Sequence, residues 1–420
     1  MNRFRADPRL LAPLLAGLAM LGPFSIDTLF PAFRRLGQEF AASPQAIQQI
    51  ISVYLAAYAV MALLHGPLSD AYGRRGVIVW STALFVLASV GCALAPSLGA
   101  LLGFRALQGI AAGAGLIVGR AIVRDRYHGA EATRLMATIT LIFGMAPALA
   151  PIVGGWLLTI SGWRSILWAL AAFAAALTLL TVGALPETLP RERRIRLSLP
   201  RLAQTYRAIG SDARFLWLAC AAVGNFGALW IYIASAPAVV LGLLGLNVRQ
   251  FAWLFVPTIG GMMVGARLAG RYAGHWTAAQ TVARGYWLIG AAAALHVSLA
   301  VFLPPRLPWF VLPIALNGVG VSLAFPTLTL LMLDRFPATR GAAASVQTAV
   351  SLAANALLAG TLAPLVDRSA LGLALSATLL SAFGYGCWTR YLRLTPAPEP
   401  SVLTQHAGDA AATPEIPAGR

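Results

Sequence analysis

The stretch Gly66-Pro67-Leu68-Ser69-Asp70-Ala71-Tyr72-Gly73-Arg74-Arg75 is a short charged segment between two long apolar runs, residues 47–68 and 76–95. Glycine, proline and polar residues favour a turn. The runs on either side are each long enough to cross the hydrocarbon core of a bilayer as a helix. The segment therefore predicts the point at which the chain leaves a membrane and re-enters it.

The composition of the whole chain agrees with a membrane protein. Hydrophobic residues make up 59% of the 420 residues and charged residues only 11%. The net charge of +17 comes from arginine alone, because the chain has no lysine. These arginines lie in the short gaps between apolar runs and form no continuous basic face with aromatic residues, so we expect no nucleic-acid binding. The three cysteines lie within apolar runs, and their spacing fits neither a disulfide framework nor a metal site.

Twelve apolar runs are long enough to span a bilayer, where only helices satisfy their own backbone groups. The predicted fold class is an all-α membrane protein with twelve transmembrane helices in two six-helix bundles. We expect an N-terminal bundle over 1–185, a basic linker over 186–213, a C-terminal bundle over 214–392 and a disordered tail over 393–420. The predicted spans are 10–31, 47–68, 76–95, 98–119, 134–160, 165–185, 214–241, 250–270, 282–303, 308–333, 341–366 and 370–391.

The positions of the arginines predict the orientation, because arginine is enriched on the cytoplasmic side of membrane proteins. A cytoplasmic N-terminus leaves few arginines outside, namely Arg34, Arg35, Arg164, Arg249, Arg306 and Arg368. Most of the others then lie in the cytoplasm. We therefore expect both termini, the Gly66–Arg75 turn and the linker on the cytoplasmic side.

The two halves of the chain resemble each other weakly. The segment Ala266-Arg267-Leu268-Ala269-Gly270-Arg271 repeats part of the Gly66–Arg75 turn, with Gly270 where the first half has Asp70. Parallel repeats of six spans are typical of transporters whose halves move about a central site.

Three motifs resemble signatures of the major facilitator superfamily. They are Gly66-x-Leu68-x-Asp70-x-x-Gly73-Arg74-Arg75 after span 2, Arg105-x-x-Gln108-Gly109 in span 4, and Pro151-x-x-Gly154-Gly155 in span 5, where Ala150 replaces the usual glycine. Further segments resemble the Bcr/CflA branch of drug:proton antiporters: 25–31, 120–125, 162–166 and 185–189. The resemblance implies a multi-pass transporter of a bacterial inner membrane.

Asp27 is the only one of the 14 acidic residues that lies well inside a predicted span. A carboxyl group in hydrocarbon is costly unless it faces a cavity or is protonated, which makes Asp27 a functional candidate. A buried Arg105 needs an acceptor, and Asp27 is the available intramembrane carboxylate. We predict that Asp27, Arg105 and Gln108 couple transport to protons; for Arg105 the resemblance implies this role. The alternatives are an acid near the outer headgroups and an arginine that reaches the membrane surface or bonds to carbonyl groups.

The acidic and basic residues around the turn predict a conformational latch. Arginine can bridge two carboxylates, so we expect Arg74 between Asp70 and Asp125. An acid near a helix N-terminus is favoured by the helix dipole, so we expect Asp70 against the start of span 11 near Gly341. The latch would favour the outward-facing state, and the alternative is a set of separate solvated charges. Its predicted residues are Gly66, Asp70, Gly73, Arg74, Arg75 and Asp125.

Prolines and small residues in span 5 predict a kinked, close helix contact at Pro147, Pro151, Gly154 and Gly155. The resemblance also implies a cavity between the halves. Aromatic residues with few polar groups would suit amphiphilic cargo there, although each aromatic could instead face lipid. The cavity candidates are Phe24, Tyr54, Tyr58, Asn225, Trp230, Tyr232, Trp253, Asn317, Gln347 and Asn355.

The chain lacks a G-x-x-x-x-G-K-[ST] nucleotide-binding loop and any protease or hydrolase arrangement, so we expect neither an enzyme nor a cofactor. The predicted function is a monomeric secondary transporter, driven by the proton gradient, that exports small amphiphilic drug-like compounds in exchange for protons by alternating access. Its partners would be small-molecule cargo, protons and the lipid bilayer. A proton-coupled exporter of metabolites, amino acids or peptides is one alternative, and a non-transporting membrane sensor or scaffold is another.

Overall fold

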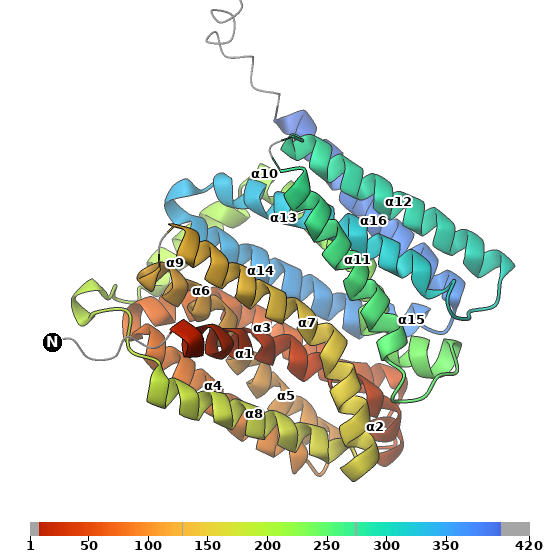
Figure 1. The fold of residues 1–420 in the computed structure, drawn as a ribbon, viewed down its shortest axis with the longest axis horizontal. Helices are drawn as coiled ribbons and strands as arrows, with labels where there is room; N and C mark the ends of the chain where they lie inside the picture. The colour runs from red at the N-terminus through yellow and green to blue at the C-terminus, as the bar shows by residue number, and fades with distance from the viewer. Residues whose placement is uncertain (1–7, 128, 274, 396–420) are drawn as a thin grey trace, which may run out of the picture.

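The structure is a computed structural model that describes residues 8–127, 129–273 and 275–395, and within these ranges it contains helices, turns and loops but no strand (Figure 1). It holds 12 segments long and apolar enough to cross a membrane. The predicted fold class is therefore confirmed. Most of the predicted disordered tail, 393–420, lies outside the described residues.

The first bundle begins at the N-terminal end of the described chain. Polar side chains cap two of its helices, Ser43 at the start of α3 and Ser97 at the start of α5. Its elements are α1 (Pro8–Asp27), η1 (Phe30–Ala32), α2 (Phe33–Glu39), α3 (Pro44–Tyr72), α4 (Arg74–Ala93), α5 (Leu98–Ala112), α6 (Ala114–Arg126), α7 (Gly129–Ser161) and α8 (Trp163–Ala184).

A linker with two helical elements, η2 (Arg191–Arg193) and α9 (Leu199–Gly210), leads to the second bundle. Asp212, Thr277 and Ser369 cap three helices of that bundle. Its elements are α10 (Ala213–Ala234), the π-helix η3 (Ala238–Leu243), α11 (Ala252–Arg271), α12 (Ala278–Phe302), α13 (Val311–Asp334), η4 (Pro337–Thr339), α14 (Arg340–Leu357), the π-helix η5 (Leu358–Leu362), α15 (Ala363–Val366) and α16 (Ala370–Leu394).

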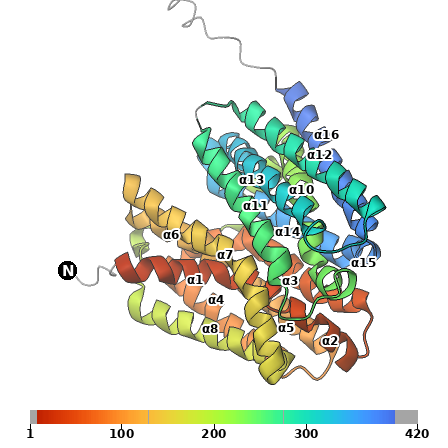
Figure 2. The same ribbon diagram turned by 45° about the vertical axis from the view of Figure 1, so that its right-hand side comes forward.

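The two bundles lie side by side and come together at one end (Figure 2). We call the membrane face with the start of α1 and with α9 the linker face, and the opposite face, with α2 and α15, the far face. Every side-chain hydrogen bond that joins the bundles within the described ranges lies in the far-face half of the spans. Gln48 donates to the Ala234 carbonyl at 2.7 Å and Gln49 to the Gly360 carbonyl at 3.1 Å. The far side of the contact is thus closed.

Two helical elements differ from the expected layout. The first span does not end near Pro31, because η1 and α2 continue it to Glu39. The predicted basic linker contains α9, whose Tyr206 hydroxyl donates to the Leu63 carbonyl at 2.6 Å. Burial, and then the nearby Asp70 carboxylate, raises the pKa of Tyr206. The linker is therefore packed against the first bundle through α9.

Candidate transport site

Arg105 is the centre of a buried polar network that joins four helices of the first bundle. Its side chain is fully buried on α5. The guanidinium donates through Nη1 to the Ser25 hydroxyl at 2.9 Å and to the Gln108 side-chain oxygen at 2.7 Å, and through Nε to the Ile50 carbonyl at 3.2 Å. It also lies 4.3 Å from the centroid of the Tyr54 ring. A buried cation requires such acceptors to offset its lost hydration.

Gln108 extends this network to α4, because its side-chain nitrogen donates to the Ser89 hydroxyl at 2.7 Å. Arg105 Nη2, by contrast, is buried and has no partner among the described residues. An unmade hydrogen bond of a charged group is costly. Arg105 therefore retains one donor that another acceptor could use.

Asp27 is the last residue of α1 and is the only acidic side chain that is buried in the part of the chain described. The expected partnership with Arg105 is not present in this arrangement, where the neighbouring Ser25 takes that place. No arginine lies within ion-pairing distance of Asp27 among the described residues. Arg105 instead follows the alternative in which carbonyl groups serve as acceptors, and the Ser25 hydroxyl and the Gln108 side-chain oxygen join the Ile50 carbonyl in that role.

The predicted close contact of span 5 lies beside Asp27. A Cβ atom at Gly154 would clash with the carbonyl oxygen of Thr28, the residue after Asp27. A Cβ atom at Gly155 would clash with the carbonyl oxygen of Val248 in the second bundle. Glycine is needed at both positions because backbone atoms approach it closely. Pro147 and Pro151 lie inside α7, about two turns and one turn before this contact, respectively.

The cavity candidates do not form a single group. Tyr54 and Tyr58 are buried on α3 with their rings edge to face, and the Tyr54 hydroxyl donates to the Gly22 carbonyl. Phe24 packs against Phe173 of α8. Trp253 is 55% exposed on α11 and therefore does not belong to the buried set. The prediction was wrong because this span is apolar on all sides, so residue types do not identify its inner face.

The candidates of the second bundle are mostly engaged within that bundle. Trp230 donates to the Asn355 carbonyl at 3.0 Å. Tyr232 shares a 2.8 Å hydrogen bond with His296 of α12, which gives both residues a structural role there. Three further candidates have buried amide side chains. Gln347 donates to the Thr329 hydroxyl, whereas Asn225 and Asn317 have side-chain polar atoms with no hydrogen-bond partner among the described residues.

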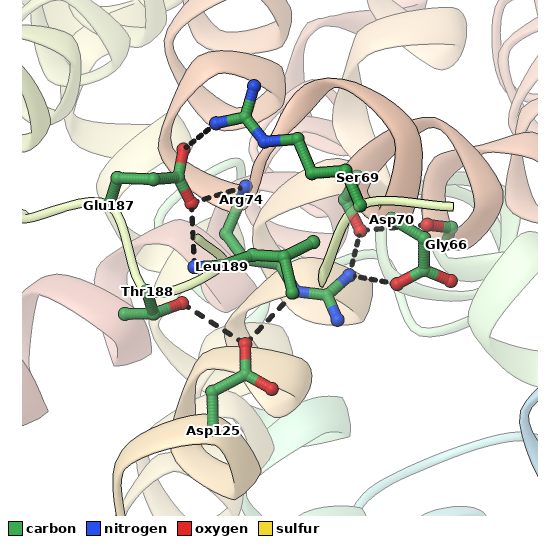
Figure 3. Close-up of polar contacts among 9 residues, drawn as sticks. Gly66, Ser69, Asp70, Arg74, Asp125, Glu187, Thr188 and Leu189 are labelled. Atoms are coloured by element: carbon green, nitrogen blue, oxygen red, sulfur yellow. Dashed lines mark hydrogen bonds and ion pairs between the residues drawn. The ribbon is translucent and has the colours of Figure 1, made fainter. Parts of the chain in front are cut away.

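The Gly66–Arg75 segment holds a second polar cluster, at the linker face (Figure 3). The predicted turn is much shorter than expected, because α3 continues to Tyr72 and only Gly73 lies between the two helices. Gly73 has φ +99°, a conformation that glycine adopts without strain, and it separates α3 from α4. The Arg74 side chain forms an ion pair with Asp70 and another, at 3.1 Å, with Asp125 of α6. Arg74 also donates to the Ser69 hydroxyl at 2.6 Å, and Ser69 in turn donates to the Gly66 carbonyl. Arg75 instead donates to the Val182 carbonyl of α8.

Two residues of this cluster, Glu187 and Thr188, carry no role in the sequence prediction. Glu187 accepts from the backbone N–H of Arg74 at 2.9 Å, and Thr188 donates to Asp125 at 3.1 Å (Figure 3). Their only signal in the sequence is the segment 185–189, which resembles the Bcr/CflA branch but does not indicate a partner.

The expected contact between Asp70 and the start of span 11 is absent from the described structure. A Cβ atom at Gly341 would meet nothing within 4 Å, and the Asp70 side chain is 44% exposed. The reason is the geometry of the two bundles: the side-chain hydrogen bonds that join them within the described ranges lie at the far face and not at the linker face.

Comparison with known proteins agrees with this architecture. The family description "Major Facilitator Superfamily" matches residues 15–364. The chain belongs to the major facilitator superfamily. As a member of this superfamily it is a membrane transporter and not an enzyme.

Individual relatives of this major facilitator support the resemblance to the Bcr/CflA branch, which is confirmed. The chain is 26% identical over 361 residues to a bicyclomycin resistance protein homolog of Haemophilus influenzae, covering 82% of this chain and 87% of the relative. It is 25% identical over 383 residues to multidrug resistance protein D of Escherichia coli, with coverage of 89% and 94%. It is 35% identical over 268 residues to the uncharacterized MFS-type transporter YdgK of Bacillus subtilis, covering 63% of this chain and 66% of YdgK.

Solved structures show the same fold for this major facilitator. A bacterial homolog of the human lysosomal transporter Spinster, in an inward-facing and occupied conformation, superposes with a TM-score of 0.70 at 17% identity. That match covers 95% of this chain and 100% of the solved chain.

Proposed function

We propose that the protein exports small amphiphilic compounds in exchange for protons by alternating access. The single observation that supports this most is Asp27, a buried acid without an ion-pair partner among the described residues, beside the Arg105 network and the Gly154 contact. Ionisable groups inside a membrane are rare and mark ion pathways. The names of the relatives, a bicyclomycin resistance homolog and a multidrug resistance protein, support drug-like cargo.

The proposed coupling depends on the protonation of Asp27. A neutral, protonated Asp27 tolerates its buried position without a cation. A deprotonated Asp27 requires a donor, and Arg105 Nη2 is a buried donor that is not in use. Movement of the carboxylate towards Nη2 would change the position of Thr28, on which Gly154 packs, and so connect proton loss to a movement of α7. Cargo that competes with the proton for this site would be exchanged for it.

We place the linker face in the cytoplasm, because it carries the arginine-rich linker. With this orientation the closed far face is extracellular, and the arrangement described corresponds to an inward-facing state. The Arg74 cluster would then rest on the first bundle and become part of an interbundle latch only after the bundles rock together at the linker face.

The decisive experiment measures proton release from purified protein when bicyclomycin is added, followed by exchange in liposomes with an imposed pH gradient. We expect proton release and gradient-driven uptake into inside-out liposomes for the native chain, and loss of both for Asp27→Asn. Asp334→Asn is the matched control, since the Asp334 side chain is 62% exposed at the linker face. Proton-coupled transport by Asp27→Asn at the native rate would refute the coupling role.

The same assay separates the alternatives. A sensor or scaffold would bind without gradient-driven exchange. An exporter of metabolites, amino acids or peptides would show no response to drugs but would change the extracellular metabolite profile when overproduced.

A further inference from the structure

A cavity of about 630 Å³ opens at the far face between the two bundles. Residues of α2 and the start of α3 line it from the first bundle, and η3, the residues before it and Asp367 line it from the second. Its volume is in the range of small-molecule sites. It shares no residue with the Arg105 network or with the Arg74 cluster.

The cavity carries one cation and one anion, each from a different bundle. Arg34 lies on α2, and Asp367 follows α15. Neither side chain forms an ion pair in the described part of the chain, with the other or with any third residue. The two opposite charges therefore line the same cavity while remaining available to a ligand.

Two uncharged polar residues, Gln48 and Ser235, also belong to the cavity wall. Gln48 is buried and donates to the Ala234 carbonyl, which fixes one wall. Ser235, the next residue, is 1% exposed, and its hydroxyl has no described hydrogen-bond partner. Apolar side chains, among them Phe33, Ile47 and Leu241, supply much of the remaining lining.

Asp367 is also distinguished by its surroundings. Burial raises the pKa of its carboxyl, while the adjacent Arg368 opposes this shift. A ligand ammonium group would replace part of the hydration that the Asp367 carboxylate has lost.

We propose that this cavity is a binding site for a small zwitterion, with an ammonium group for Asp367, a carboxylate for Arg34 and an apolar body between them. Because the ligand would contact both bundles, it would stabilise the arrangement in which the far face is closed. Bound from the far side, it would slow the opening of that face. The consequence for export rests on the proposed function, whereas the binding itself does not.

Binding can be tested without transport on the full-length purified protein by calorimetry. The probe is the dipeptide leucyl-leucine, which has both charges and an apolar body. N-acetyl-leucyl-leucine lacks the ammonium group, and leucyl-leucinamide lacks the carboxylate. We expect the dipeptide to bind about tenfold more tightly than either derivative, the size expected for the loss of one charged hydrogen bond.

The variants assign each charge to one end of the probe. Arg34→Gln should weaken the dipeptide about tenfold and leave leucyl-leucinamide unchanged, since that probe has no carboxylate. Asp367→Asn should weaken the dipeptide similarly and leave the acetylated probe unchanged. Arg35→Gln is the matched control, because Arg35 is the residue after Arg34 on α2 and does not line the cavity. The unchanged probe in each variant also reports correct folding.

Equal affinity for the three probes, no binding of any of them, or loss of affinity in Arg35→Gln equal to that in Arg34→Gln would overturn the site. In liposomes, dipeptide added on the far side should slow exchange severalfold, and this slowing should disappear in Asp367→Asn. Binding without any slowing would overturn the conformational part of the proposal and leave the site itself established. Absence of exchange in every sample, with binding intact, would count against the proposed function instead.

Discussion

Glu187 accepts a hydrogen bond from the backbone N–H of Arg74, and by this contact the chain that leaves α8 is attached to the start of α4. The N-terminus of a helix favours an anion, because its first N–H groups are unpaired and its dipole is positive there. Glu187 also forms a 3.6 Å ion pair with Arg194 of the linker. The turn is thus held by the linker as well as by its own charges.

Replacement of Glu187 by glutamine should loosen the linker. The amide accepts a weaker hydrogen bond from the Arg74 N–H, and it has no charge to attract Arg194 or the helix dipole. We expect the loss of these interactions to cost about 1 kcal/mol. We expect trypsin to cleave the linker arginines roughly fivefold faster, as measured by limited proteolysis of purified protein. Asp334→Asn is the control, because Asp334 is exposed and lies outside the linker. An unchanged cleavage rate in Glu187→Gln would show that this contact does not hold the linker.

Substitution of Asp70 by asparagine should affect the conformational cycle rather than cargo affinity. Asp70 binds Arg74 in the described arrangement and does not reach the start of α14. The amide retains a hydrogen-bond acceptor but not the charge that would favour a helix N-terminus after the bundles move. We expect transport to fall about tenfold with the dissociation constant of the cargo unchanged, measured by paired flux and binding assays. Full transport by this variant would refute the latch.

The contact of α7 with the second bundle should be sensitive to one methyl group. Gly155→Ala places a Cβ atom against the Val248 carbonyl, so the bundles must separate slightly at the far face. We expect a destabilisation of about 1–3 kcal/mol, seen as a lower midpoint of thermal unfolding, together with faster labelling of cysteines introduced on the far side. Gly144→Ala in the same helix is the control, because a Cβ atom there meets nothing within 4 Å. Equal midpoints for the two variants would contradict the contact.

Asp212 should contribute to stability in a pH-dependent way. Burial favours its protonated form, but hydrogen bonds from Arg335 and from the Phe215 N–H prevail and lower the pKa of the carboxyl. A lowered pKa means that the stabilisation is fully present above the unfolded value of about 3.9 and is lost as the pH falls through the folded value.

The corresponding measurement compares the thermal midpoints of native protein and Asp212→Ala from pH 7 to pH 3. Loss of the cap and of the ion pair should cost about 1–2 kcal/mol at pH 7. The difference should stay constant down to about pH 4 and narrow below it. A difference that does not change with pH would assign the effect to packing alone.

Sequence reasoning predicted the spans well because long apolar runs in a membrane have few structural alternatives. It predicted Arg74 between two acids because all three side chains lie at span ends on one face of the membrane. It missed Glu187 because the partner is a backbone N–H 113 residues away in the sequence. It misplaced Trp253, and paired Arg105 with Asp27, because neither the inner face of an apolar helix nor the presence of carbonyl and hydroxyl acceptors can be recognised from residue types alone.

The hydrogen bonds that close the far face have a thermodynamic consequence. Gln48, Gln49 and Ser52 all donate to main-chain carbonyls of the second bundle, so none of these bonds involves a charge. Each neutral bond contributes about 0.5–1.5 kcal/mol. Their sum of about 1.5–4.5 kcal/mol is less than the roughly 5.5 kcal/mol that converts a 1:99 population into 99:1. Salt and external acidity would leave these three bonds almost unaffected and would act on the closure mainly through Arg249, whose guanidinium donates to Thr159 of α7 at 3.2 Å. The free energy of a single binding or protonation event would then suffice to shift the equilibrium of the closure.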